Sequence, residues 1–221
     1  MLMNKVKNFK HSVSHIHIQN RVTSFIRLTL LIAIGWGLYD RRYVLAILSF
    51  AIFFLTYLPS LIERKYRIEL PDELELLTIL FIYASLFLGE LHGYYTRFWW
   101  WDVVLHISSG FALGFTGFLI LYILYYKNKI AANPFLISLF SFCFALAIGA
   151  LWEIFEFFID SNFGFNMQKS GLRDTMWDLI VDSGGAFFFS FIGYFYLKGK
   201  KTPIVSRIIN NFVRNNRELF G

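Results

Sequence analysis

The stretch PFLISLFSFCFALAIGALWEIFEFFI, residues 134–159, decides the fold. It runs for 26 residues and contains only two charged side chains, Glu153 and Glu156. A helix rises about 1.5 Å per residue, so a helix of this length crosses a hydrocarbon layer about 30 Å thick. The stretch therefore predicts a membrane-spanning helix.

Five other stretches have a similar length and composition. With 134–159 they predict six spans, the others being residues 22–39, 43–62, 74–91, 103–126 and 176–197. The whole chain is 57% hydrophobic and 16% charged, which is more apolar than a soluble domain. We expect an all-α, polytopic membrane helix bundle in the cell (cytoplasmic) membrane, with a basic cytoplasmic leader at 1–21, a membrane domain at 22–197 and a basic tail at 198–221.

The distribution of Lys and Arg predicts the direction of the spans. With the N-terminus in the cytoplasm, sixteen of these residues lie inside, and the five outside are Arg41, Arg42, Arg97, Lys169 and Arg173. Short cytoplasmic loops of membrane proteins carry the excess of Lys and Arg, so both termini are expected in the cytoplasm. The net charge of +6 then reports topology, and we expect membrane lipids rather than nucleic acid as partners.

The tail contains a second type of helix. Its apolar residues fall on one helical stripe while the arginines lie off it, the stripe being Ile204, Val205, Ile208, Ile209, Phe212 and Val213. This pattern predicts an amphipathic helix that lies on the inner leaflet, or one that packs on the bundle or on a partner.

Acidic residues gather at the predicted outer ends of the last three spans. Helical spacing places each set on one face, the sets being Asp102 with His106, then Glu153, Glu156 and Asp160, then Asp174, Asp178 and Asp182. A charge at membrane depth costs roughly a few kcal/mol, so such residues normally face a bundle interior or a wet cavity. We expect one cavity, one or two turns beneath the outer surface, to collect His106, Glu153, Asp178 and Asp182.

This residue set fits two kinds of chemistry. Carboxylates and an imidazole can bind one divalent cation, where oxygen favours Mg, Mn or Ca and histidine draws Zn, Mn or Fe. Without a metal, the same acids are proton donors and acceptors. The four residues are therefore candidate metal ligands and candidate catalytic groups. Supporting or substrate-binding positions are Asp102, Glu156, Asp174, Arg173, Glu90 and His92.

Structural roles are open alternatives for part of this set. Asp102 and Asp174 stand at helix starts, where a carboxylate can cap free N–H groups. Lys169 and Arg173 could neutralise carboxylates from the loop in an ion-pair network. Ser108 and Ser109 are candidate nucleophiles, although small polar residues in a packed helix have the same appearance.

Three motifs carry a resemblance to a known family. They are WWDVVLH at 100–106, GALWEIFEF at 149–157 and GLRDTMWDLIVDSGGA at 171–186. In this order they resemble the bacterial membrane proteins of the DUF2238, or YjdF, type, over about residues 88–194. The resemblance implies a polar site on the outer face and brings no reaction with it.

The same motifs are more loosely similar to the VanZ-like superfamily. Its recurring elements are an Asp-Lys-x-x-His start, a helix end with Glu, and a helix start with Arg and Asp. Matching positions here are Asp102 and His106, Glu153, and Arg173 with Asp178. Val103 stands where the Lys is usual, and the Glu-x-x-Gln element reads Glu153 to Glu156.

Three functions are compatible with these residues. The first is a membrane-embedded, hydrolase-like enzyme, metal-dependent if the cluster binds an ion, that acts on a lipid or lipid-linked substrate. The second is an ion-coupled or proton-coupled transporter that uses the same acids as a relay. The third is a non-catalytic scaffold or stress-tolerance factor, in which the cluster only joins the helices.

Overall fold

The computed structural model describes residues 2–127 and 129–220, with side chains described from residue 19 onward. Most of the predicted basic leader lies outside the described side chains, so its role stays a prediction. The described residues form helices without a strand, and six helical segments are long and apolar enough to cross a membrane. The predicted all-α polytopic fold is confirmed, whereas the cytoplasmic placement of the termini stays a prediction.

Proline marks where several helices begin. The first turns of α3, α7 and α9 contain Pro59, Pro134 and Pro203. A backbone N–H in the first turn has no acceptor within its own helix, so a proline there costs no helical hydrogen bond. In chain order the elements are α1 (Leu2–Tyr39), α2 (Tyr43–Leu55), α3 (Leu58–Tyr66), α4 (Asp72–Ile82), the π-helical η1 (Tyr83–Leu91), α5 (Tyr94–Arg97), α6 (Trp101–Tyr126), α7 (Pro134–Phe163), α8 (Leu172–Leu197), α9 (Pro203–Asn215) and α10 (Arg217–Phe220).

The second predicted span is interrupted near its middle. It was expected as one helix over 43–62, but α2 ends at Leu55 and α3 begins at Leu58. Pro59 cannot donate a backbone hydrogen bond, which frees a carbonyl in the preceding turn. Arg27 of α1 donates to both the hydroxyl and the carbonyl of Thr56, at 3.1 and 3.2 Å, and so satisfies polar groups at the break.

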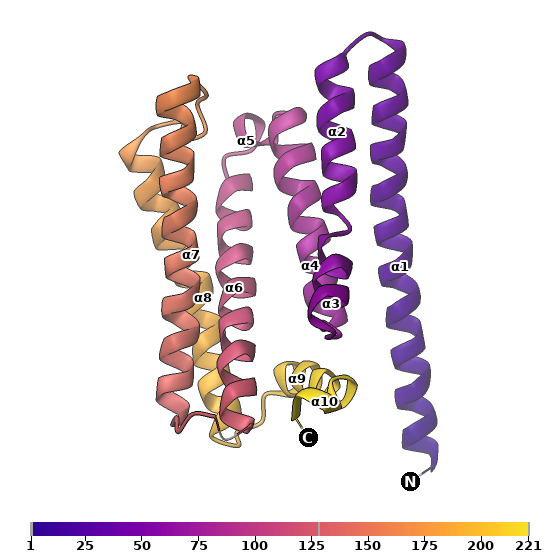
Figure 1. The fold of residues 1–221 in the computed structure, drawn as a ribbon, viewed down its shortest axis with the longest axis vertical. Coiled ribbons are helices and arrows are strands. Elements are labelled where there is room, and N and C mark those ends of the chain that lie inside the picture. Colours follow the sequence, from indigo (N-terminus) through magenta and orange to yellow (C-terminus); the bar gives the residue numbers. More distant parts are fainter. Residues whose placement is uncertain (1, 128, 221) are drawn as a thin grey trace. The chain divides into compact units, whose positions relative to one another are not determined.

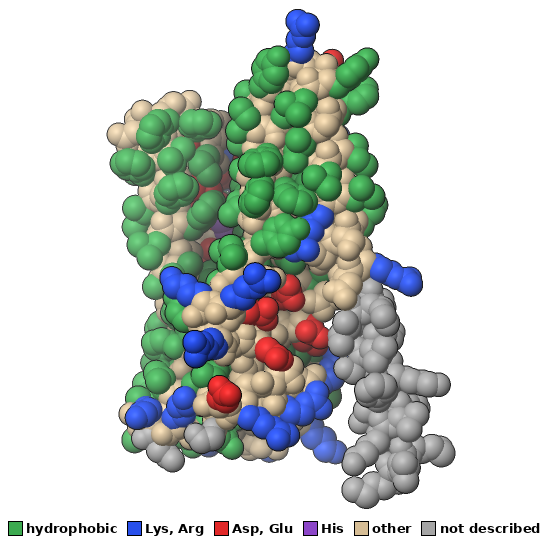
Figure 2. All heavy atoms as spheres, turned by 45° about the vertical axis from the view of Figure 1, so that its right-hand side comes forward, with side chains coloured by type: hydrophobic (Ala, Val, Ile, Leu, Met, Phe, Trp, Pro, Cys, Tyr) green, Lys and Arg blue, Asp and Glu red, His purple; other side chains and the backbone are tan. Residues whose placement is uncertain are grey.

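The chain divides into two compact units, Met1–Tyr94 and Tyr95–Gly221. In the N-terminal unit, α1 and α2 pack along each other and α4 with η1 adjoins them (Figure 1). Their shared core is apolar and consists of Ile26, Leu30, Ile52, Ile79 and Phe87. Hydrophobic side chains cover the outer surface of α1 and α2 (Figure 2), as expected of helices that face lipid.

The C-terminal unit is a bundle of α6, α7 and α8, each of which packs on the other two. Aromatic rings fill its core: the ring of Phe189 on α8 lies 5.1 Å from the ring of Phe115 and 5.9 Å from that of Phe118, both on α6. Ser141 of α7 donates to the carbonyl of Gly114 at 2.6 Å, which adds a polar contact between two helices. The last three predicted spans therefore form one rigid framework.

The tail folds back within the C-terminal unit. Val205, Ile209 and Phe212, on the predicted apolar stripe of α9, are buried. Phe220 of α10 places its ring 5.2 Å from the ring of Tyr126 at the end of α6. The packed alternative for this helix is the one seen here, and contact with the inner leaflet stays a prediction.

Two glycines allow α6 and α8 to touch backbone to backbone. A Cβ atom on Gly110 would overlap the carbonyl of Asp182, and one on Gly185 would overlap the carbonyl of Ile107. Small residues permit this close approach of helices in membranes. The contact lies within one turn of His106 and so sets the distance between α6 and the acids of α8.

Alanine substitution of the adjacent Gly184 and Gly185 should distinguish the effect of helix packing on stability from the effect of helix propensity. Gly185→Ala is expected to destabilise the protein by about 1–3 kcal/mol, because the new methyl group forces the helices apart. Gly184→Ala is the matched control, since nothing lies within 4 Å of its added Cβ. The control should be neutral or up to about 1 kcal/mol more stable. Thermal unfolding of both variants in one detergent tests this, and equal midpoints would contradict it.

Candidate functional site

His106 lies between acids of two helices. Its Nε2 atom is 3.6 Å from Oδ1 of Asp102, one turn earlier on α6, and 3.8 Å from Oδ1 of Asp178 on α8. One ligand atom from each of these three residues lies within 4.8 Å of the others. The side chains of Asp178 and Asp102 are buried and partly buried, so bulk water screens this concentration of charge weakly.

The other ring nitrogen of His106 faces a third carboxylate. Its Nδ1 atom is 3.4 Å from Oδ2 of Asp182, although the geometry is that of an ion pair rather than of a hydrogen bond. Ser109 donates to Oδ1 of Asp182 at 2.9 Å and so fixes that carboxylate. A Cβ on Gly149 of α7 would lie 2.7 Å from Oδ2 of Asp182, so glycine at this position leaves room for the carboxylate.

Glu153 is the most unusual side chain of the unit. It is 3% exposed, and neither of its carboxylate oxygens makes a hydrogen bond of good geometry among the described residues. The side chains of Thr175 and Gln168 nevertheless lie close enough to interact with it, and His106 attracts it. It lies one turn after Gly149 and on the same face of α7, which directs it toward the side of the bundle where Asp182 lies. Gln168 donates to the backbone carbonyl of Glu153 at 3.3 Å and to Thr175 at 2.7 Å.

Acidic side chains near both ends of the loop between α7 and α8 accept hydrogen bonds from its backbone. Both carboxylate oxygens of Asp160 accept backbone N–H groups at 2.8 Å, from Met167 and Gln168. Asp174 accepts the backbone N–H of Lys169 at 3.1 Å. These bonds hold Gln168 and Lys169 beside the acids of the cluster.

The sequence left open whether Asp102 caps a helix and whether Lys169 and Arg173 neutralise the cluster, and the structure answers each question separately. The N-cap of α6, Trp100, makes no side-chain cap bond, and Asp102 instead contacts His106 and Lys169. Lys169 Nζ is 3.1 Å from Oδ2 of Asp102 and 4.3 Å from the ring centre of Tyr95. Arg173 is exposed and forms no ion pair within the described part of the chain. Of the two predicted loop cations, only Lys169 reaches the cluster.

Three more predicted residues occupy other surroundings. The carboxylate of Glu156 is buried and accepts the indole N–H of Trp152 at 2.9 Å. Glu90 and His92 belong to the N-terminal unit, where Nδ1 of His92 is 2.7 Å from the carbonyl oxygen of Phe87. Their expected place at the rim of the cavity stays a prediction.

Sequence spacing anticipated the meeting of His106 with Asp178 and Asp182. It placed Asp102 in the supporting set, whereas the structure puts this residue as close to Nε2 as Asp178. It also assigned nothing to Gly149 and Gln168. No pattern in one sequence marks a glycine that faces a carboxylate, and the loop position of Gln168 depends on the bonds of Asp160.

The distances around Nε2 suit a shared cation. Ligand atoms about 2.1 Å from one ion are about 3 to 4 Å from one another, which matches the two contacts of Nε2. Three protein ligands leave a coordination position open, as in catalytic zinc sites. Asp182 lies 3.4 Å from Nδ1, on the side of the ring where a carboxylate orients many histidine ligands, although it makes no hydrogen bond to Nδ1 in this structure.

Comparison with known proteins places the chain among membrane proteins. A family model described as "Predicted membrane protein (DUF2238)" matches residues 22–199. A Thermotoga maritima protein, described as uncharacterized, is 28% identical over 156 residues, which cover 70% of this chain and 79% of that protein. No solved structure matches. The similarity to VanZ-like proteins remains a resemblance of motifs.

Glu153 and Asp160 differ in the number of hydrogen bonds that their carboxylates accept, and this difference predicts opposite effects of substitution on stability. Glu153→Gln should raise the thermal midpoint, because it removes a buried charge that makes no well-formed hydrogen bond among the described residues. Asp160→Asn should lower the stability by about 1–3 kcal/mol, because an amide cannot accept both loop N–H groups as the carboxylate does. Thermal unfolding in metal-free buffer measures both variants, and a loss of stability in Glu153→Gln would show that its carboxylate has a partner.

Proposed function

The chain belongs to the DUF2238 family of predicted membrane proteins, and we propose that its carboxylate and histidine cluster is the centre of a metal-dependent hydrolase. The substrate is a lipid or a lipid-linked molecule, reached from the outer leaflet of the cell membrane. The ion is a single divalent cation of the group Zn, Mn, Mg or Fe.

One observation carries this proposal, namely that carboxylates flank both ring nitrogens of His106. Asp102 and Asp178 lie at Nε2, where an ion would be shared, and Asp182 lies at Nδ1. A neutral imidazole binds a metal through one nitrogen while the other donates its proton to an acceptor. The cluster places a carboxylate near each ring nitrogen, at 3.4 to 3.8 Å, and with the ammonium of Lys169 on Asp102 it retains an excess of negative charge.

Glu153 is the candidate proton acceptor. A divalent ion at the cluster would polarise an ester or phosphoester oxygen and activate a water molecule. Glu153 would take a proton from the attacking water and return it to the leaving alcohol oxygen, so that hydrolysis consumes one water and no other reactant. A carboxylate without a well-formed hydrogen bond among the described residues is suited to this exchange, and Ser109 donates to Asp182 and is not free to attack.

The surroundings favour an amphiphilic substrate. Val104 and Ile107 on α6 and Trp177 and Ile180 on α8 alternate with the cluster residues in sequence and are largely exposed. Exposed apolar side chains on a membrane helix are in contact with acyl chains. A molecule with a polar head and a lipid tail could place the head at His106 while its tail stays in the bilayer.

A structural role of the cluster is the second candidate, and the ion pair of Lys169 favours it. This contact joins the loop before α8 to Asp102 on α6, as expected of a network that only holds helices together. The transporter is less well supported. Toward the other end of the unit the core is closed by packed rings, including those of Phe111, Phe115 and Phe118 around Phe189.

Metal analysis tests the proposal. Full-length protein purified with added divalent metal should contain about one equivalent, measured by inductively coupled plasma mass spectrometry. His106→Ala and Asp178→Asn should remove it, and Asp182→Asn should weaken binding about 10–100-fold, because the orienting carboxylate is lost. Asp40→Asn, in the exposed turn between α1 and α2, is the control and should retain full occupancy.

The same measurement can refute the metal centre. Less than one equivalent of any divalent metal in the wild type, unchanged in His106→Ala, would show that the cluster binds no ion. Circular dichroism and gel filtration of each variant establish that metal loss does not follow from unfolding.

Lys169→Met distinguishes the two candidates. If the cluster binds a metal, removal of the competing ammonium should leave metal affinity equal or higher. If the cluster is a network, the variant should have a lower thermal midpoint, by an amount equivalent to about 1 kcal/mol or less for a partly exposed pair, and no bound metal. Lys200→Met, exposed beyond the end of α8, controls for the lost charge.

A further inference from the structure

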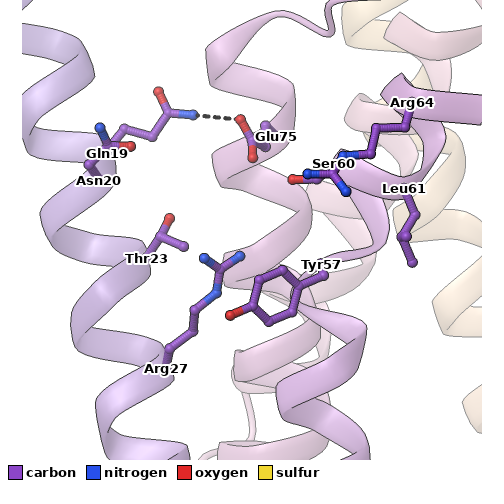
Figure 3. Close-up of a pocket in the computed structure, with 9 residues that line it drawn as sticks. All are labelled: Gln19, Asn20, Thr23, Arg27, Tyr57, Ser60, Leu61, Arg64 and Glu75. Carbon is purple, nitrogen blue, oxygen red and sulfur yellow. Dashed lines mark hydrogen bonds between the residues drawn. The ribbon is translucent and has the colours of Figure 1, made fainter. Parts of the chain in front are cut away.

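The N-terminal unit contains a polar cavity of its own. Its volume is about 390 Å³, within the range of small-ligand sites. Residues of α1, α3 and α4 and the turn at Tyr57 line it (Figure 3). Residue spacing does not indicate this cavity, because its polar residues are scattered singly over three helices and lie partly outside the predicted spans.

Two arginines supply the charge of this cavity. The guanidinium of Arg27 is fixed by its two bonds to Thr56 and lies 3.8 Å from the ring centre of Tyr57. Two of its five N–H donors are thus used, and the others remain for a ligand. Arg64, on α3, is exposed and also lines the cavity. A guanidinium held in one orientation is well suited to bind phosphate oxygens.

The remaining wall adds hydrogen-bond donors and one acid. Thr23 and Ser60 contribute hydroxyl groups. Gln19 donates to the carboxylate of Glu75 at 3.3 Å, and Figure 3 shows this pair near the upper end of the view, apart from the guanidinium of Arg27. The lining contains two arginines and one glutamate. Glu63 and Asp72 lie close enough to Glu75 to interact with it, so the positive charge of the cavity is confined to the side of Arg27 and Arg64.

The position of the cavity along the helices indicates where a ligand comes from. Arg27 lies eight residues after the start of the span Gln19–Tyr39, about 12 Å along the helix, and Arg64 lies two residues before the end of the span Tyr43–Tyr66. The depth is that of the headgroup region and the adjoining acyl chains. Arg21 and Arg67 at the same span ends add positive charge that attracts anionic lipid.

We propose that the cavity between α1, α3 and α4 is a binding site for the phosphate group of an anionic phospholipid, with Arg27 and Arg64 as its cationic contacts. The site is independent of the His106 cluster. Because α1 and α3 both contribute to it, the bound lipid would stabilise the interrupted second span against α1.

Lipid titration of the full-length protein tests this site. Thermal unfolding in detergent is measured with increasing phosphatidylglycerol, with phosphatidylcholine, and with inorganic phosphate. Phosphatidylglycerol should raise the midpoint in a saturable manner. Arg64→Gln should weaken the apparent affinity about tenfold, as expected for the loss of one charge-assisted contact. The side chain of Arg64 makes no hydrogen bond or ion pair with another residue that the structure describes, so this variant should fold as the wild type does, whereas Arg27→Gln also removes the bonds to Thr56.

Lys65→Gln is the matched control, since it removes the same charge from the same helix without touching the cavity. Retained affinity in this control and loss in Arg64→Gln support the site. A saturable shift with inorganic phosphate and the same dependence on Arg64 also supports a phosphate site and assigns it to a soluble ligand. Equal weakening in both variants, or equal shifts with phosphatidylcholine, would overturn the proposal.

Discussion

The backbone contact between α6 and α8 is the constraint on which the C-terminal unit depends. Gly110 and Gly185 bring the two helices so close that a methyl group would overlap a carbonyl of the facing helix. His106 lies one turn from Gly110, and Asp182 contributes the carbonyl that Gly110 meets. The same contact that packs the bundle therefore fixes the imidazole among the carboxylates of α8.

The cluster concentrates acid where lipid surrounds the protein. In water such charges would repel one another weakly, but in a medium of low dielectric they need a counter-charge, a proton or a cation. Lys169 reaches Asp102, while Asp178 and Asp182 have His106 as their common neighbour. Glu153 is buried without a well-formed hydrogen bond among the described residues, which separates its role from that of the residues around the imidazole.

In the N-terminal unit, a side chain satisfies backbone polar groups at a break in a membrane span. The break before Pro59 exposes backbone polar groups within a span, and Arg27 meets them from α1. In a bilayer, irregular backbone is tolerated only where protein or a polar cavity satisfies it. Arg27, which bonds to Thr56 at this break, also lines the cavity between α1, α3 and α4. The guanidinium of Arg27 therefore both satisfies the helix break and contributes charge to the polar cavity.

Sequence by itself determined the six spans and the faces on which the acids lie, because both follow from apolar length and from the helical period. It also indicated that Asp178 and Asp182 would meet His106. Only the tertiary structure decided which ring nitrogen each acid approaches, that Lys169 rather than Arg173 reaches the cluster, and that Glu153 is buried without a well-formed hydrogen bond among the described residues. These outcomes depend on helix rotation and on close contacts at Gly110 and Gly149, and a difference of one ångström between helices leaves no trace in residue spacing.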